Sequence, residues 1–136
     1  MPNKVLIVDD DPLMHLLYKN QLERAGYQLV VAKDGLEAIE VAARELPQLI
    51  VMDIIMSEMD GLAALRELKK NEATKLIPVV ISTASVSAHH ATKRECENSG
   101  AAGFLTKPFS PAQLLAEVRR LVPQPVSDPA PGKTSS

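Results

Sequence analysis

The stretch Leu49-Ile50-Val51-Met52-Asp53 decides the fold of this chain. Four consecutive apolar residues are typical of a short strand that is covered on both faces of a sheet. Pro47 before the run and the Asp-Gly pair at 60–61 after it favour a strand over a buried helix segment. The run ends on a carboxylate, and ligands bind at the carboxyl ends of strands in open parallel sheets. Asp53 is therefore a candidate functional acid, although for this stretch alone an Asp that merely ends a strand is the simpler explanation.

Strands and helices alternate along the chain. Continuous apolar runs predict further strands over 5–8, 29–32, 77–81 and 104–106. Helical spacing of apolar residues predicts helices over 12–25, 35–46, 62–70, 87–99 and 114–121. The helix over 87–99 is expected to be weak, because its many charged and polar residues leave a thin apolar stripe. Five strands alternating with five helices predict a doubly wound α/β fold, a five-stranded parallel sheet with helices on both faces.

The apolar stripes also predict which side chains the helices bury. Asp11 is expected to cap the first helix, with Pro12 in its first turn. The expected inward residues are Met14, Leu17, Tyr18, Leu22 and Ala25 in the first helix, Leu36, Ile39, Ala42, Ala43 and Leu46 in the second, Leu62, Leu65 and Leu68 in the third, and Leu114, Leu115, Val118 and Leu121 in the last.

Composition limits the function classes. The 136 residues suit one domain, and an apolar fraction of 46% suits a globular α/β protein. A formal charge of -2 argues against a general nucleic-acid binder. Cys96, the one cysteine, excludes an internal disulfide. The apolar run at 5–8 is too short for a signal peptide or a membrane span, so we expect a soluble cytoplasmic protein without membrane contact.

Residues 123–136 differ in character from the rest. This segment mixes four prolines with Ser, Thr and Gly and carries no hydrophobic pattern. We therefore expect a domain over 1–122 and a disordered, Pro-rich tail or linker over 123–136.

Polar residues stand where the predicted strands end. Asp9 and Asp10 follow the first strand, Asp53 ends the third, Thr83 follows the fourth and Lys107 the fifth. In a parallel sheet these ends share one edge. Carboxylates crowded there repel one another unless a cation neutralises them, and oxygen ligands of this kind suit Mg²⁺. With a hydroxyl and a lysine beside it, such a site could neutralise a transferring phosphoryl group.

From Lys4 to about Val122 the chain resembles the receiver domain of two-component response regulators, the CheY-like family. The matching pieces are Leu6-Ile7-Val8-Asp9-Asp10, Met52-Asp53 with Met59-Asp60-Gly61, Ile81-Ser82-Thr83-Ala84 and Lys107-Pro108-Phe109. Together these motifs are highly specific for the family. The resemblance implies a flavodoxin-like strand order of 2-1-3-4-5.

The resemblance also implies roles for the edge residues. Asp53 would accept a phosphoryl group from a histidine kinase or a histidine phosphotransfer protein. Asp9, Asp10, Asp53 and the backbone carbonyl of Ile55 would bind Mg²⁺. Thr83 and Lys107 would contact the phosphoryl oxygens.

The output, by the same resemblance, is a change in protein–protein contacts. Thr83 and Phe104 would act as the switch, and the face made by the fourth helix, fifth strand and fifth helix would contact a downstream protein or a second copy. The domain would be no enzyme apart from catalysing its own phosphorylation and dephosphorylation. Phe104 stands where the family often has Tyr, so it offers a partner no hydroxyl. Ser57 stands where the family usually has proline.

Two alternatives belong to other classes. Haloacid-dehalogenase-like phosphatases combine the same residue types, but their nucleophile lies in a motif after the first strand that residues 9–13 do not match. A pseudo-receiver that only binds partners would need a damaged site, and all five edge residues are present.

Overall fold

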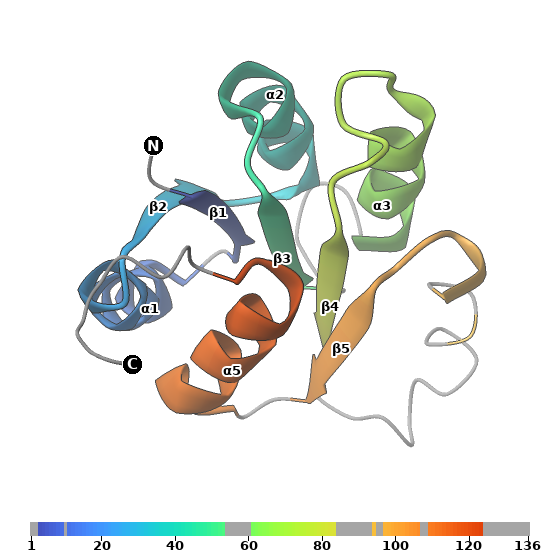
Figure 1. Cartoon of the computed structure of the whole chain (residues 1–136). Coiled ribbons are helices and arrows are strands. Elements are labelled where there is room, and N and C mark those ends of the chain that lie inside the picture. Colours follow the sequence, from blue (N-terminus) through green and yellow to red (C-terminus); the bar gives the residue numbers. More distant parts are fainter. Residues whose placement is uncertain are drawn as a thin grey trace.

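The computed structural model of the chain describes residues 3–9, 11–53, 61–83, 94, 97–106 and 109–123. Strands and helices alternate through these ranges (Figure 1). In chain order they are β1 (Asn3–Val8), α1 (Pro12–Arg24), β2 (Tyr27–Ala32), α2 (Gly35–Glu45), β3 (Leu49–Asp53), α3 (Gly61–Lys70), β4 (Val79–Thr83), β5 (Gly103–Thr106) and α5 (Pro111–Leu121).

The strands form one five-stranded sheet in the order β2-β1-β3-β4-β5. Every neighbouring pair in it is parallel. The predicted doubly wound sheet and its strand order are therefore confirmed. All carboxyl ends of the strands lie along one edge, as the parallel direction requires.

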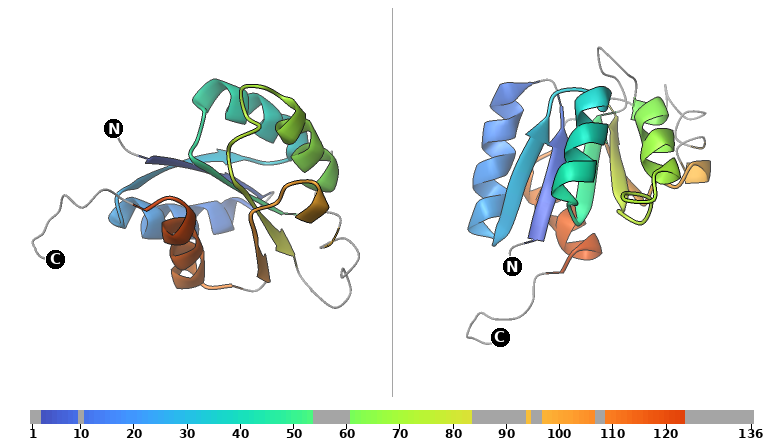
Figure 2. Two further views of the ribbon diagram at one scale, coloured as in Figure 1. Left: turned by 45° about the vertical axis from the view of Figure 1, so that its right-hand side comes forward. Right: turned by 90° about the horizontal axis from the view of Figure 1, so that it is seen from above.

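Helices cover both faces of the sheet. α1 and α5 lie together on one face, and α2 and α3 lie together on the other (Figures 1 and 2). The central strands are buried on both sides, and their side chains alternate between two cores. In β1, Leu6 and Val8 join the core beneath α2 and α3, whereas Val5 and Ile7 join the core beneath α1 and α5. The continuous apolar runs in the sequence are the signature of this double burial.

Local sequence signals fix where the helices begin. The Asp11 carboxylate accepts a hydrogen bond of 3.0 Å from the Leu13 N–H, and Pro12 occupies the first turn, so the predicted cap is confirmed. Ser110 caps α5 in the same way. Its hydroxyl accepts from the Gln113 N–H while the Gln113 side chain accepts from the Ser110 N–H.

For some residues the prediction that the side chain is buried is wrong. Leu17 is 45% exposed, Leu36 51% and Leu46 53%, and Ala43 is also exposed. α2 buries small residues, Gly35, Ala38 and Ala42, together with Val41. The backbone of α2 can therefore approach the sheet closely, and the leucines next to this stripe are turned toward solvent. Leu46 adopts a left-handed conformation with φ of 48° as the C-cap, which takes it out of the helical pattern.

Two predictions fall largely outside the described residues. Of the expected helix over 87–99, the structure describes only residue 94 and residues 97–99. Of the expected tail over 123–136, it describes only Pro123. Among the described elements no helix has the length and apolar character needed to cross a membrane.

Candidate functional site

Asp9 and Asp53 lie side by side at the carboxyl edge of the sheet. Val8 of β1 is in register with Met52 of β3, so the next residues along the two chains are the two aspartates. Adjacent strands are about 4.8 Å apart, which brings these residues close together. In both strands the odd-numbered apolar residues face α1 and α5, and strand alternation places the two odd-numbered aspartates on the same side. The predicted convergence of these carboxylates is therefore seen in the backbone register.

Asp9 is a buried carboxylate. Only 6% of the residue is exposed, whereas Asp53 is half-buried. The Asp9 N–H donates to the Ala32 carbonyl oxygen at 3.0 Å, which continues the pairing of β1 with β2 one residue beyond the strand. A buried carboxylate needs hydrogen bonds or a cation to offset the loss of water.

The β1–α1 turn holds the Asp9 side chain in place. Its Oδ1 accepts a hydrogen bond of 2.9 Å from the Asp11 N–H, and Asp11 in turn caps α1. Asp9 thus orders the turn, and Asp11 caps the helix that follows it. The cap was predicted from the sequence, but the Asp9–Asp11 bond was missed. An Asp that accepts from the N–H two residues later is a known turn signal that could have revealed it.

The ends of β4 and β5 complete the same edge. Asp53 is in register with Ser82, and Thr83 is in register with Thr106. Thr83 thus stands one step beyond the level of Asp53 on the neighbouring strand. Asp10, Ile55, Lys107 and the Thr83 side chain lie outside the described residues, so their predicted roles stay predictions.

A phenylalanine two residues after Lys107 anchors the segment that enters α5. The Phe109 ring stacks on Tyr18 of α1 with ring centroids 5.5 Å apart and an angle of 12° between the planes. Both residues are buried. Aromatic pairs of this kind add about 1 kcal/mol beyond area burial. In the sequence Phe109 stands out only as part of a motif, and the structure shows it as a positioning residue for this connection.

Phe104 is partly buried in β5. It packs against the core beneath α2 and α3 and is in register with Ile81 of β4. This placement puts its ring beside the strand that ends in Thr83. The predicted switch between Thr83 and Phe104 stays a prediction.

The donor chemistry of the edge fits Mg²⁺. Asp9 and Asp53 supply hard carboxylate oxygens, one of them buried, which is the ligand type that Mg²⁺ prefers. Among the residues that the structure describes, no three His, Cys, Asp or Glu side chains form a metal-binding group. The remaining predicted ligands, Asp10 and the Ile55 carbonyl, are not among them.

Comparison with known proteins points to one family. A family model described as "Response regulator receiver domain" matches residues 5–119. The DNA-binding dual master transcriptional regulator RpaA of Synechocystis is 37% identical over 119 residues, which are 88% of this chain and 48% of that protein. The response regulator PleD of Caulobacter vibrioides is 38% identical over 121 residues, 89% of this chain and 26% of PleD. The chain thus spans half or less of the length of these two relatives.

Solved structures are similar over nearly the whole fold. The chemotaxis response regulator CheY4 of Vibrio cholerae superposes with a TM-score of 0.82 at 31% identity, covering 90% of this chain and 100% of that one. The receiver domain of the sensor histidine kinase PA1611 from Pseudomonas aeruginosa, which has a magnesium ion in its active-site cleft, superposes with a TM-score of 0.79 at 27% identity. That match covers 91% of this chain and 100% of the other.

Proposed function

The chain belongs to the response regulator receiver domain family, and on that premise we propose that Asp53 accepts a phosphoryl group in a Mg²⁺-dependent reaction. The donor is the phosphohistidine of a histidine kinase or of a histidine phosphotransfer protein. The observation that carries this proposal is the buried Asp9 carboxylate beside the half-buried Asp53 at the carboxyl edge of the sheet.

The reaction moves one phosphoryl group between two side chains. A carboxylate oxygen of Asp53 forms a bond to phosphorus while the bond from phosphorus to the donor imidazole nitrogen breaks. The imidazole leaves with the electron pair of that bond and takes up a proton. Positioning and charge stabilisation supply most of the catalysis in such transfers. Asp53 is exposed enough to meet the donor, whereas the neighbouring Asp9 is buried.

The other edge residues have supporting roles in this proposal. Asp9, Asp10, Asp53 and the Ile55 carbonyl hold Mg²⁺, which when bound neutralises charge on the phosphoryl oxygens. Thr83 and Lys107 contact the same oxygens through a hydroxyl and an ammonium group. The domain catalyses only its own phosphorylation and dephosphorylation, and it works in the cytoplasm.

An apolar patch beside this edge supports docking of a donor protein. Leu13, Leu16 and Leu17 of α1 are 64%, 56% and 45% exposed, and α1 begins directly after the Asp9–Asp11 turn. Exposed leucines grouped on one helix are typical of a protein–protein contact. We propose that the helical surface of the phosphodonor protein covers this patch, which brings its phosphohistidine to Asp53.

The proposed output is a change in contacts with another protein or with a second copy of the chain. The face that includes β5 and α5 carries it, with Thr83 and Phe104 as the switch. A formal charge of -2 supports a protein partner over direct contact with nucleic acid.

Phosphorylation by acetyl phosphate tests the assignment of Asp53. In the presence of Mg²⁺ the intact protein is expected to gain the mass of one phosphoryl group, and removal of the metal with EDTA should abolish the gain. Asp53→Ala should stay unmodified, whereas Asp60→Ala, the matched control from the same part of the chain, should be labelled. Equal labelling of Asp53→Ala would overturn the proposal.

A further inference from the structure

A hollow lies between α1 and α5, far from the phosphorylation edge. It has a volume of about 210 Å³ and is lined by Gln21, Arg24 and Ala25 of the α1 end and by Leu115 and Arg119 of α5. α1 starts at the Asp9 edge and rises about 18 Å to Arg24 at 1.5 Å per residue. The hollow is therefore near the opposite edge of the sheet, and neither proposed Mg²⁺ binding nor phosphoryl transfer uses it.

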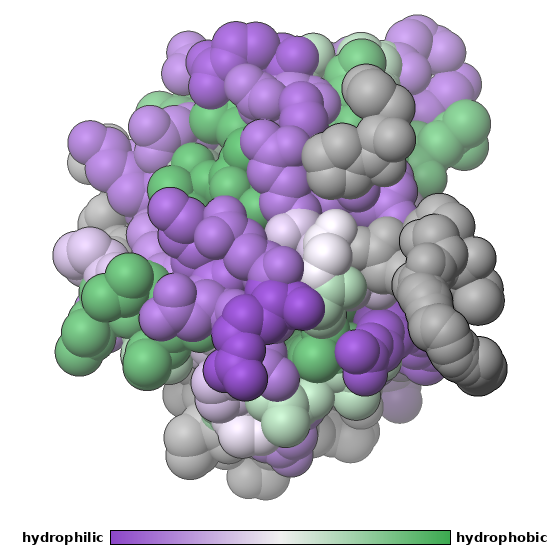
Figure 3. Space-filling model, turned by 60° about the vertical axis from the view of Figure 1, so that its left-hand side comes forward, coloured by the Kyte–Doolittle hydropathy of each residue, from purple (hydrophilic) through white to green (hydrophobic). Residues whose placement is uncertain are grey.

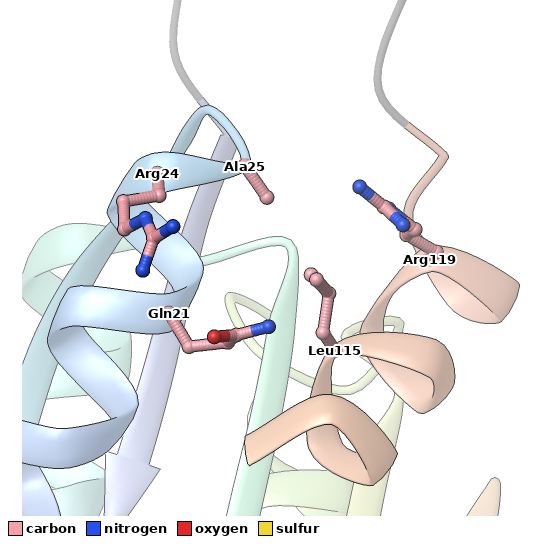
Figure 4. Close-up of a pocket in the computed structure, with 5 residues that line it drawn as sticks. All are labelled: Gln21, Arg24, Ala25, Leu115 and Arg119. Atoms are coloured by element: carbon pink, nitrogen blue, oxygen red, sulfur yellow. The ribbon is translucent and has the colours of Figure 1, made fainter.

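The lining groups are arranged around an apolar floor. In Figure 4, the Gln21 amide extends from α1 toward Leu115, and the Arg119 guanidinium extends from α5 toward Ala25. Figure 3 shows this side of the molecule, where strongly hydrophilic areas lie on either side of a strip of apolar residues. Two guanidinium groups and one amide thus border the same small space.

Several cations of the surface are held in ion pairs. Arg120 pairs with Glu117, Lys4 with Glu45 and Lys75 with Glu72. Within the described part of the chain, Arg24 and Arg119 form no ion pair. Each arginine is near the end of its helix, where a cation interacts favourably with the helix dipole. That interaction accounts for each arginine singly, but both also line the hollow with Gln21, Arg24 from the α1 side and Arg119 from the α5 side.

The two guanidinium groups and the amide that line the hollow favour a doubly charged oxyanion as ligand. A guanidinium presents paired N–H groups that match the oxygens of phosphate, and the Gln21 amide adds a neutral donor. A phosphate monoester carries a charge of about −1.5 to −2 on one tetrahedral group, which attracts guanidinium groups from both sides of the hollow. A space of about 210 Å³ is below the usual 300–1,000 Å³ of pockets for larger ligands, which favours a small ligand over a nucleotide.

We propose that this hollow is a binding site for a small phosphate monoester, held by Arg24 and Arg119 with Gln21 as a further donor and with Ala25 and Leu115 against its carbon atoms. The ligand would bridge the end of α1 to α5. Because it binds the folded domain alone, it would also raise the thermal stability of the domain.

Titration with inorganic phosphate and with glycerol phosphate, followed by amide and arginine side-chain NMR, tests the site. The full chain carrying Asp53→Asn is used without Mg²⁺, so that the phosphorylation edge contributes nothing. Ionic strength is matched with chloride. Saturable shifts are expected at Gln21, Ala25, Leu115 and Arg119, together with a rise in melting temperature.

Matched variants separate binding from general charge effects. Arg24→Gln and Arg119→Gln should each weaken phosphate binding about tenfold or more, the loss expected for one charge-assisted hydrogen bond. Arg119→Lys should recover part of it. Arg120→Gln removes the same charge from the neighbouring residue, which pairs with Glu117, and should leave binding unchanged.

Three results would overturn the proposal. The first is shifts that do not saturate, or that chloride reproduces. The second is an equal loss in Arg120→Gln. The third is saturation by succinate but not by either phosphate, which would make the site one for dicarboxylates.

Discussion

The Tyr27 hydroxyl donates a hydrogen bond of 2.6 Å to the carbonyl oxygen of Val122, across 95 residues of chain. Tyr27 begins β2, one of the two edge strands of the sheet, and Val122 follows the last residue of α5. Both residues are buried, and Tyr27 belongs to the core beneath α1 and α5. The bond therefore ties the outer strand to the end of the last helix.

Replacement of Tyr27 by Phe should cost about 1 kcal/mol of unfolding free energy at pH 7, the usual net value of one buried hydrogen bond. The ring and its packing remain, so the loss isolates the hydroxyl. Urea denaturation of the variant and the wild type measures it. A stability change below the error of the extrapolation would contradict the role given to this bond.

The same variant should also change how the free energy of unfolding depends on pH at alkaline pH. Burial raises the pKa of the Tyr27 hydroxyl above 10.0, although the Arg119 charge opposes part of that rise. The folded state then holds the proton more tightly than the unfolded state. The Tyr27 hydroxyl therefore contributes free energy of unfolding that is fully present below pH 10. That contribution is lost as the pH rises through the pKa of the hydroxyl in the folded state. The gap between wild type and Tyr27→Phe should therefore narrow above about pH 10.

Lys69 changes the stability in the opposite sense, over a pH range that ends near 10.5. Its ammonium donates to the Ile77 and Lys75 carbonyl oxygens, and burial lowers its pKa. Burying the charged ammonium destabilises the folded state, and this destabilisation decreases as the pH rises toward 10.5 and the lysine loses its proton. Lys69 is present in both proteins, so its contribution cancels in the difference between them. Parallel curves for wild type and Tyr27→Phe above about pH 10 would show that the Tyr27 pKa is not raised by the fold.

Gly103 of β5 makes room for an ion pair. A Cβ at this position would collide with the Glu117 carboxylate and would lie 2.7 Å from Nη2 of Arg120. Arg120 Nε donates to Glu117 at 3.0 Å, and Arg120 Nη2 also reaches the Ala102 carbonyl oxygen at 3.4 Å. We expect Gly103→Ala to destabilise the domain slightly, because the exposed ion pair must move to admit the Cβ atom.

The sign of this effect should reverse when the pair is absent. In the Glu117→Ala/Arg120→Ala background nothing is displaced, and alanine lowers the backbone entropy of the unfolded chain. Gly103→Ala should then stabilise the domain by about 0.4–1 kcal/mol. Thermal and urea unfolding of the four proteins form the cycle. The same sign in both backgrounds would mean that the pair does not require the glycine.

The sheet was predictable because its strands are continuous apolar runs. Runs such as Val5–Val8 and Leu49–Met52 are buried on both faces of the sheet, so the prediction did not depend on which face each side chain occupies. Helix faces were harder to predict. Leu36 and Leu46 were expected inside α2, but the small residues of that helix allow the closer approach to the sheet. Size, rather than hydrophobicity, decides which stripe packs there.

The candidate site was predictable to the extent that it follows strand ends. Asp9 and Asp53 are brought together by parallel register, which chain order and strand type imply. The hollow near Arg24 was not predictable in this way. Arg24 and Arg119 come from helices far apart in the sequence, and Arg119 beside Arg120 looks like ordinary surface charge. Only the packing of α1 on α5 gives them a common space.

The exposed leucines of α1 should affect transfer from a protein donor alone. Leu13→Ser and Leu16→Ser should each slow phosphotransfer from a histidine phosphotransfer protein about tenfold or more, since burial of a leucine stabilises a contact by about 1.5–3 kcal/mol. Labelling by acetyl phosphate should be unchanged, because a small donor needs no docking surface. Leu76→Ser, at a leucine that is 87% exposed elsewhere, is the matched control. Equal slowing with both donors would place the defect in the chemistry rather than in docking.

Thr83→Ala tests whether the domain switches or only relays a phosphoryl group. Phosphorylated Asp53 adds negative charge and acceptor oxygens at the carboxyl edge, and the Thr83 hydroxyl is the proposed group drawn toward them. Phe104 stands in β5 beside the strand that ends in Thr83, where its partly buried ring can respond. Under saturating phosphorylation, wild type should show amide shifts over residues 97–106 that Thr83→Ala loses. Thr106→Ala, the same substitution at the residue in register with Thr83, should keep them. If Thr83→Ala shows the wild-type shifts, Phe104 is a fixed core residue and the domain is a relay, because a phosphoryl group shifts a conformational equilibrium only through contacts that differ between its two states.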